Sequence, residues 1–141
     1  MSERIFRMQL LCGYQEPDNM VASLQVKVFE DDEWKAFDLN AGSPGFLVFV
    51  YAVLSCQHMH MRLGCVDRGL HLDSAEGDIE IVTTEDWMIT KLRVAFSAQL
   101  REGDASAEDV DTIVKRMKNC PVSRNLTFAP HSETRLEFHA R

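Results

Sequence analysis

Cys56 is the side chain of greatest chemical interest, because it lies in an apolar segment with ionisable residues close behind it. Residues 46–56 contain no charged side chain. His60 follows Cys56 by four positions, which places the two on one face of a helix, and Arg62 lies on a neighbouring face. A cysteine reacts as its thiolate, which positive charge stabilises. A protonated His60 or the Arg62 guanidinium could therefore lower the pKa of Cys56 and make it a nucleophile.

The alternative interpretation of Cys56 is an ordinary core residue, because free cysteines are among the most buried side chains. The four cysteines form no Cys-x-x-Cys pair, so a structural zinc site has no support. His58 and His60 point to different helical faces, and no third ligand is evident beside Cys56 and His60. We therefore expect no metal and no other cofactor, with Cys12 and Cys65 as packing residues.

A second cysteine of interest, Cys120, directly follows a predicted helix. Ser106 starts that helix as a cap, with Asp109 three positions later, and Pro121 ends it. The carboxyl end of a helix disfavours an anion. Cys120 is therefore the poorer first nucleophile of the two unless Arg124 compensates, but a thiol that attacks second needs less activation.

The composition narrows the class of protein. With 141 residues, the chain is long enough for one domain, 1–141, whose core needs no disulfide or metal. A formal net charge of −7 argues against a nucleic-acid partner, which normally requires a basic patch. The apolar segment ends at Gln57, short of the about 20 residues that a membrane span needs, so no membrane partner is expected. The N-terminus lacks an apolar region of signal-peptide length, which predicts a cytoplasmic protein with reduced cysteines.

The hydrophobic pattern predicts an α+β fold with the element order β-β-β-α-β-β-α-β. The expected elements are an N-terminal meander at about 4–39, a buried central helix at about 44–66, a second sheet with a helix at about 76–120 and a C-terminal strand at about 133–139. Ser43 is predicted to cap the central helix, with Pro44 at its first position. The helix is predicted to stop near Gly64 or to break before Gly69, a helix-ending glycine. The alternation of apolar residues predicts that Leu24 and Met88 face the core.

Two motifs within this order resemble a known family. The first is Ala52-Val53-Leu54-Ser55-Cys56 on the apolar helix. The second, and the more specific, is Cys120-Pro121-Val122-Ser123, followed closely by Leu126. Together with the element order, these motifs resemble the OsmC/Ohr family, the osmotically inducible and organic hydroperoxide resistance proteins. The resemblance extends over about 4–139.

The resemblance implies an OsmC-like fold assembled as an intertwined homodimer, with its sites at the subunit interface. It also implies a thiol-dependent peroxidase that reduces organic hydroperoxides. By the motifs, Cys56 would be the peroxidatic cysteine, which attacks the peroxide and becomes a sulfenic acid. Cys120 would be the resolving cysteine, which condenses with it to a disulfide. A dithiol reductant would then restore both thiols.

Two positions depart from the family pattern. Family peroxidases usually carry an arginine in the first hairpin, where this chain reads Cys12-Gly13-Tyr14-Gln15-Glu16, and a glutamate after the helix-opening proline, where it has Gly45. His60, Arg62 and Arg124 are the possible activating residues in their place. Two functions therefore stay open. One is the peroxidase, and the other is a non-enzymatic or weakly active OsmC-like domain that binds an apolar ligand or a partner at its dimer interface.

Overall fold

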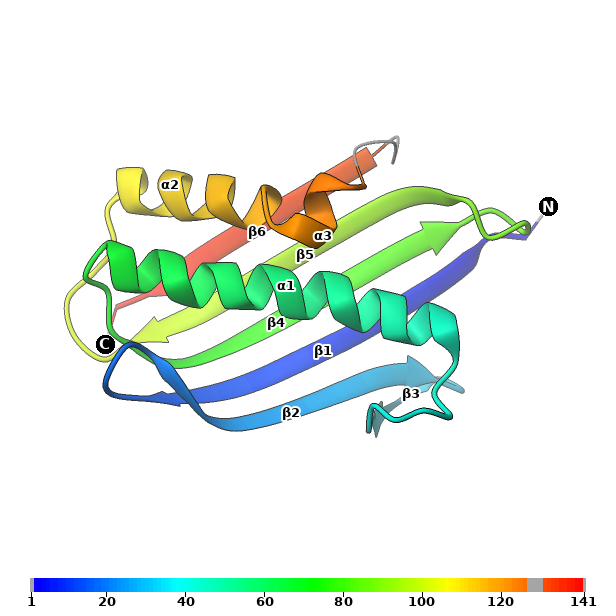
Figure 1. The fold of residues 1–141 in the computed structure, drawn as a ribbon, viewed down its shortest axis with the longest axis horizontal. Helices are drawn as coiled ribbons and strands as arrows, with labels where there is room; N and C mark the ends of the chain where they lie inside the picture. Colours follow the sequence, from blue (N-terminus) through cyan, green and yellow to red (C-terminus); the bar gives the residue numbers. More distant parts are fainter. Residues whose placement is uncertain (1, 127–130, 141) are drawn as a thin grey trace.

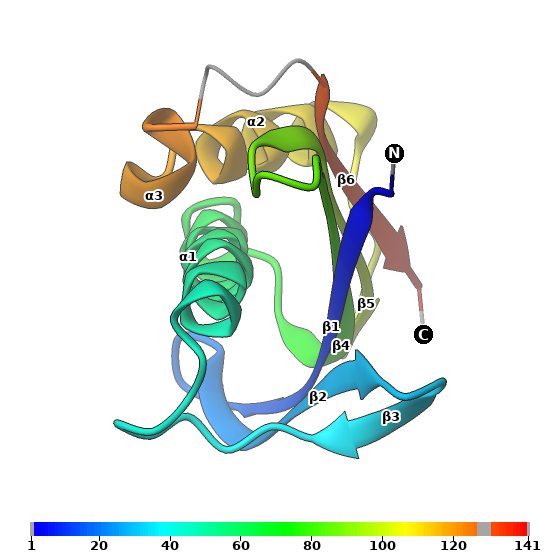
Figure 2. The same cartoon turned by 90° about the vertical axis from the view of Figure 1, so that its right-hand side faces the viewer.

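The computed structural model describes residues 2–126 and 131–140. Within these residues six strands form one sheet, and the helices pack on one of its faces (Figures 1 and 2). The elements in chain order are β1 (Arg4–Gln15), β2 (Met20–Glu30), β3 (Glu33–Ala36), α1 (Gly45–Asp67), β4 (Leu72–Thr83), β5 (Ile89–Leu100), α2 (Ala107–Lys118), α3 (Pro121–Arg124) and β6 (His131–His139). The α+β class and the predicted order are confirmed, with α3 as an unpredicted addition.

The strand order in the sheet is β3-β2-β1-β4-β5-β6. The predicted three-stranded meander is confirmed, because β1 pairs with β2 and β2 with β3, both antiparallel. The predicted second sheet is wrong. β4 pairs antiparallel with the other edge of β1, from Arg4 opposite Thr83 to Gly13 opposite Ser74, so all strands share one sheet. β6 runs parallel to β5, which requires a crossover, and α2 and α3 provide it.

The Phe96 side chain of β5 lies over Gly77, its paired residue on β4. A Cβ at position 77 would lie well inside van der Waals contact distance of the Phe96 ring. The ring also stacks on His58 of α1, with centroids 5.8 Å apart and planes 12° from parallel. The missing side chain at Gly77 therefore lets Phe96 lie over the strand and under the helix.

The central helix α1 lies across the concave face of the sheet (Figure 2). It begins one residue later than predicted, because Pro44 and not Ser43 is its N-cap. The Ser43 hydroxyl instead accepts a hydrogen bond from the Asn40 N–H at 3.1 Å and so closes the preceding loop. Of the two predicted stops, the one before Gly69 is confirmed, since the helix continues past Gly64 to Asp67 and Gly69 has a φ of 70°.

The second helix, α2, packs beside α1 (Figure 1). Its predicted cap is confirmed, because the Ser106 hydroxyl accepts from the Asp109 N–H while the Asp109 carboxylate accepts from the Ser106 N–H. Asp109 also pairs with Arg68 at 2.7 Å, which fixes the start of α2 to the end of α1. Ile113 of α2 contacts Gly64, where even a Cβ would come within 3.2 Å. The two helices therefore approach closely.

The core lies between the sheet, α1 and α2, but some residues predicted to be buried are not covered by the described chain. Leu24 is 48% exposed although its partner Cys12 is 4% exposed, because α1 packs against β1 and β4 and does not cover β2. Met88 precedes β5 and is 63% exposed. On α1, Met59 and Leu63 are 44% and 37% exposed, so one side of the predicted buried helix is open. Among the described residues, no helix has the length and apolar character needed to cross a membrane.

Candidate thiol site

Cys56 and Cys120, 64 residues apart in the chain, are neighbours in the structure. The Cys120 thiol lies close enough to Cys56 to raise its pKa. The short helix α3 brings them together, because Cys120 is its N-cap and Pro121 its first residue. The first turn of a helix has free N–H groups. In α3 the Ser123 N–H donates to Cys120 Sγ at 3.3 Å, and the Val122 N–H lowers the pKa of Cys56. Both cysteines thus lie beside backbone N–H groups at the start of α3.

The surroundings of Cys56 favour its thiol over its thiolate. Burial and the hydrogen bond with Cys120 raise the pKa of Cys56 to about 11, against the lowering effect of the Val122 N–H. No described cation is among the groups that shift this pKa. Both cysteines are free thiols, Cys120 fully buried and Cys56 half-buried. Within one described chain, Cys56 is therefore accessible but weakly ionised at neutral pH.

Alkylation of Cys56 is expected to accelerate about tenfold per pH unit from pH 7 to pH 10, because only the thiolate reacts and its fraction rises tenfold per unit below the pKa. Iodoacetamide labelling followed by peptide mass spectrometry measures the rate at Cys56 alone. In Cys120→Ser the rate at pH 8 is expected to be higher, because the Cys120 thiol, which raises the pKa of Cys56, is replaced by a hydroxyl that does not ionise. A plateau already below pH 8 in the wild type would contradict this account.

A buried polar network adjoins the two thiols and was not predicted from the sequence. Gln57, only 1% exposed, donates from Nε2 to Ser123 Oγ at 3.0 Å. Its Oε1 accepts from Thr134 Oγ1 of β6 at 3.1 Å. The one sequence signal was that Gln57 is the first polar side chain after the apolar segment and directly follows Cys56. Its partners lie 66 and 77 residues further along the chain, beyond any local pattern.

Two of the possible activating residues, His60 and Arg124, lie near one another. Burial and the cations Arg116 and Arg124 lower the pKa of His60, so its imidazole is neutral at pH 7. Among the described residues its Nδ1 is buried without a hydrogen-bond partner. A neutral imidazole supplies no positive charge. His60 in this state does not activate Cys56 in the way that its position at i+4 suggested.

The third possible activating residue, Arg62, belongs to a different cluster. Its Nη1 donates to the Asn19 carbonyl at 3.1 Å, and its charge lowers the pKa of His58. The buried His58 also shares a 2.7 Å hydrogen bond with the Tyr14 hydroxyl. The pKa of Cys12, in the same cluster, is raised by burial, against the lowering effects of Tyr14 and Arg62. Arg62 is thus placed beside Cys12, and its charge is not among the groups that act on Cys56.

Protonation of His58 should destabilise the fold. Burial and the Arg62 charge lower the pKa of His58 from 6.5 to about 4 in the folded chain. Between these pH values the unfolded chain binds more protons than the folded one, so this contribution to stability is complete above pH 6.5 and is lost as the pH falls to 4. The expected loss is about 3 kcal/mol in the free energy of unfolding. Urea unfolding across this range should show a smaller pH dependence in His58→Gln, while the exposed His131→Gln should behave as the wild type.

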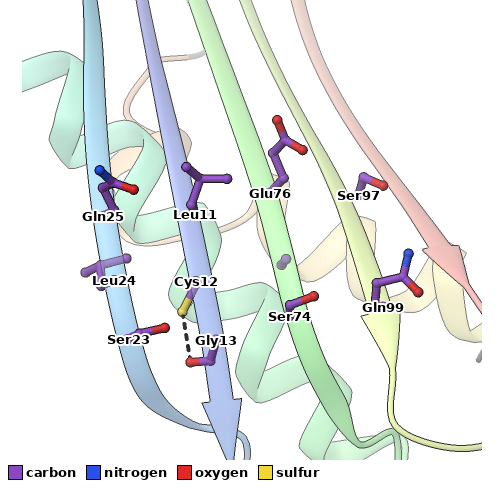
Figure 3. A pocket seen from close by; sticks show the side chains of 11 residues that line it. Leu11, Cys12, Gly13, Ser23, Leu24, Gln25, Ser74, Glu76, Ser97 and Gln99 are labelled. Carbon is purple, nitrogen blue, oxygen red and sulfur yellow. Dashed lines mark hydrogen bonds between the residues drawn. The ribbon is translucent and has the colours of Figure 1, made fainter. Parts of the chain in front are cut away.

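A hollow of about 510 Å³ lies on the face of the sheet opposite to α1 (Figure 3). Polar side chains of β2, β4 and β5 line it, among them Ser23, Ser74, Glu76, Ser97 and Gln99. These side chains alternate along their strands with residues that face the core, so the sheet separates the hollow from Cys56 and Cys120. The hollow contains no predicted site residue. Among the described residues, no three His, Cys, Asp or Glu side chains come together as metal ligands.

A second hollow, of about 450 Å³, adjoins the first half of α1. It is lined by Gly45, Phe46, Phe49, Trp87, Met88 and Ile89, which are almost all apolar. Phe49 precedes Cys56 by seven residues, so both side chains leave α1 in nearly the same direction, about 10 Å apart along the axis. This apolar hollow therefore lies along the same side of the helix as Cys56.

Solved structures resemble this fold over most of its length. An OsmC-like hydroperoxide resistance protein from Jannaschia sp. CCS1 matches with a TM-score of 0.60 at 12% sequence identity, covering 89% of this chain and 88% of that chain. An OsmC-like protein from Mycoplasma pneumoniae matches with a TM-score of 0.53 at 8% identity, covering 92% and 94%. At such identities the likeness establishes the fold alone.

Sequence comparison gives the family. A search of curated proteins found no significant match to the whole chain. The sequence model of the OsmC-like protein family matches residues 40–135 of this chain. These residues include both Cys56 and the Cys-Pro-Val-Ser motif. This match covers more than half of the chain, and the solved relatives have the same fold. The chain therefore belongs to the OsmC-like protein family.

Proposed function

We propose that this chain is a thiol-dependent peroxidase that reduces organic hydroperoxides through Cys56 and Cys120. The observation that carries the proposal is that these two thiols, 64 residues apart in the chain, lie together at the start of α3, where the Ser123 N–H donates to Cys120 Sγ. Two neighbouring free thiols, one of which is half-buried, suit reversible disulfide formation.

In the proposed reaction the Cys56 thiolate attacks one peroxide oxygen, and the O–O bond breaks. The alcohol leaves with a proton, and Cys56 becomes a sulfenic acid. Cys120 then attacks the Cys56 sulfur, the S–O bond breaks, and water is released as the disulfide forms. The hydroperoxide has thus oxidised the two thiols by two electrons. An external dithiol returns these electrons by exchange and restores Cys56 and Cys120.

The apolar hollow supports an organic hydroperoxide as the substrate. Its lining of Phe46, Phe49, Trp87, Met88 and Ile89 can bind the hydrocarbon part of a hydroperoxide by burial of apolar surface. One solved structure of similar fold is described as an OsmC-like hydroperoxide resistance protein. The lining and the family together support this substrate class.

We also propose that the chain works as a homodimer. The open side of α1 exposes Met59 and Leu63, and the inner face of β2 exposes Val21 and Leu24. Exposed apolar surface of this kind is typical of an interface. A second copy of the chain is the occupant that the family predicts, and it would cover the side of α1 that one chain leaves open.

One observation favours the alternative function, a non-enzymatic or weakly active OsmC-like domain that binds an apolar ligand. The raised pKa of Cys56, with no described cation among its causes, would make the thiol a slow nucleophile at neutral pH. A domain of this kind would bind an apolar ligand in the hollow beside Trp87 without reducing it. A steady-state assay of the wild type with cumene hydroperoxide and dithiothreitol separates the two. Dithiol-dependent turnover that rises with pH supports the peroxidase, and absence of turnover by folded protein at pH 9 supports the binding domain.

A further inference from the structure

The resolving segment is held in place by apolar and by polar contacts. None of the four residues of α3 is fully buried, but Val122 packs, partly buried, against the core. Cys120 at its start is fully buried, and Leu126 beyond its end is 9% exposed. A side-chain hydrogen bond also joins α1 to α3, from Gln57 Nε2 to Ser123 Oγ at 3.0 Å.

Gln57 is itself held in one orientation. Thr134 Oγ1 in β6 donates to its Oε1 at 3.1 Å, which directs its Nε2 toward Ser123. Ser123 in turn donates its N–H to Cys120 Sγ at 3.3 Å. A continuous chain of hydrogen bonds therefore runs from β6 through Gln57 and Ser123 to the Cys120 sulfur. A buried amide that lost one of these partners would be left unsatisfied, which makes the arrangement costly to break.

From this network we infer that Gln57 is a positioning residue for disulfide formation: it holds α3 so that the Cys120 sulfur can attack Cys56. The inference rests on the Cys56–Cys120 pairing of the proposed function. Gln57 takes no part in bond making. In the step that it assists, the Cys120 thiolate attacks the sulfur of oxidised Cys56, a Cys56–Cys120 bond forms, and the group on Cys56 leaves with the electron pair of the broken bond.

The test uses 5,5′-dithiobis(2-nitrobenzoate), because this reagent separates the two thiol steps without any peroxide. Cys56 attacks the reagent and releases one thionitrobenzoate anion, which leaves a mixed disulfide on Cys56. Cys120 then attacks that disulfide and releases the second anion. Stopped-flow absorbance gives both rates, and peptide mass spectrometry under non-reducing conditions confirms the Cys56–Cys120 product.

Gln57→Leu and Ser123→Ala each remove the hydrogen bond, and each is expected to slow the second release by roughly tenfold, the factor for one lost hydrogen bond. The first release should change by less than about twofold, because burial, the largest influence on the pKa of Cys56, stays the same. The double variant should be no slower than either single variant, since both act through one contact. Ser123→Thr keeps the hydroxyl, so its second release should proceed at about the wild-type rate.

Gln99→Leu is the matched control, because Gln99 is exposed on the opposite face of the sheet. It should release both anions at the wild-type rates. If Gln57→Leu does not fold, Ser123→Ala alone decides, because it changes a residue of a short helix that has no buried member. A second release at the wild-type rate in Ser123→Ala, or equal slowing of both releases, overturns the inference. A positive result here with no peroxide turnover would reject the proposed peroxidase and leave the positioning role intact.

Discussion

Replacing Cys56 with serine is expected to abolish dithiol-dependent reduction of cumene hydroperoxide, with a loss of at least about a hundredfold in kcat/KM. The reason is that a serine hydroxyl is not ionised at these pH values and cannot form the sulfenic acid. Cys120→Ser should behave differently. Its Cys56 is still able to consume one equivalent of hydroperoxide, but the sulfenic acid persists because no second thiol condenses with it.

The two variants are distinguished by consumption of a single equivalent of hydroperoxide and by trapping with dimedone. We expect the dimedone adduct at Cys56 in Cys120→Ser, and no adduct in Cys56→Ser. Cys12→Ala is the control, because Cys12 is a buried thiol that lies in the cluster of Tyr14 and Arg62. Full turnover by Cys56→Ser, or loss of turnover in a folded Cys12→Ala, would show that the reactive thiol has been wrongly assigned.

Gly77→Ala is expected to lower the free energy of unfolding by about 3 kcal/mol, the upper part of the usual range for overpacking. The added methyl group would meet the Phe96 ring, which is 2% exposed and stacks on His58. Either the ring shifts and loses its stacking on His58, or β4 and β5 separate locally. Urea unfolding followed by circular dichroism measures the change.

Gly45→Ala is the matched control for this prediction. Position 45 is the first residue of α1, and a Cβ there would meet nothing within 4 Å. Alanine is also the better helix former, so Gly45→Ala should be as stable as the wild type or slightly more stable. If Gly77→Ala unfolds at the same urea concentration as Gly45→Ala, the packing of Phe96 over Gly77 has been described wrongly.

The sequence predicted the long elements because their signals are local and repeated. The apolar run from Phe46 to Cys56 located α1, and the stripe with its capping Ser106 located α2. It did not predict the pairing of β1 with β4, because nothing in either strand specifies a partner some 70 residues away. It also treated Pro121 only as the end of a helix, whereas the same proline begins the four-residue helix α3.

The candidate site was predicted in its two cysteines but not in its surroundings. Helical spacing correctly put His60 and Cys56 near one face, but it gave no information on the arginines that surround His60. Arg62 was placed by its contact with Asn19, in a turn between β1 and β2. The buried amide of Gln57 could be recognised only after Ser123 and Thr134 had been brought beside it. Tertiary contacts, not residue types, determine these features.

The central claim is that Cys56 and Cys120 form one redox pair. The most direct measurement is non-reducing peptide mapping of the reduced protein after addition of one equivalent of cumene hydroperoxide per chain. We predict one Cys56–Cys120 disulfide and one equivalent of the corresponding alcohol, with Cys12 and Cys65 still reduced. Four remaining free thiols, or a disulfide that includes Cys12 or Cys65, would contradict the account.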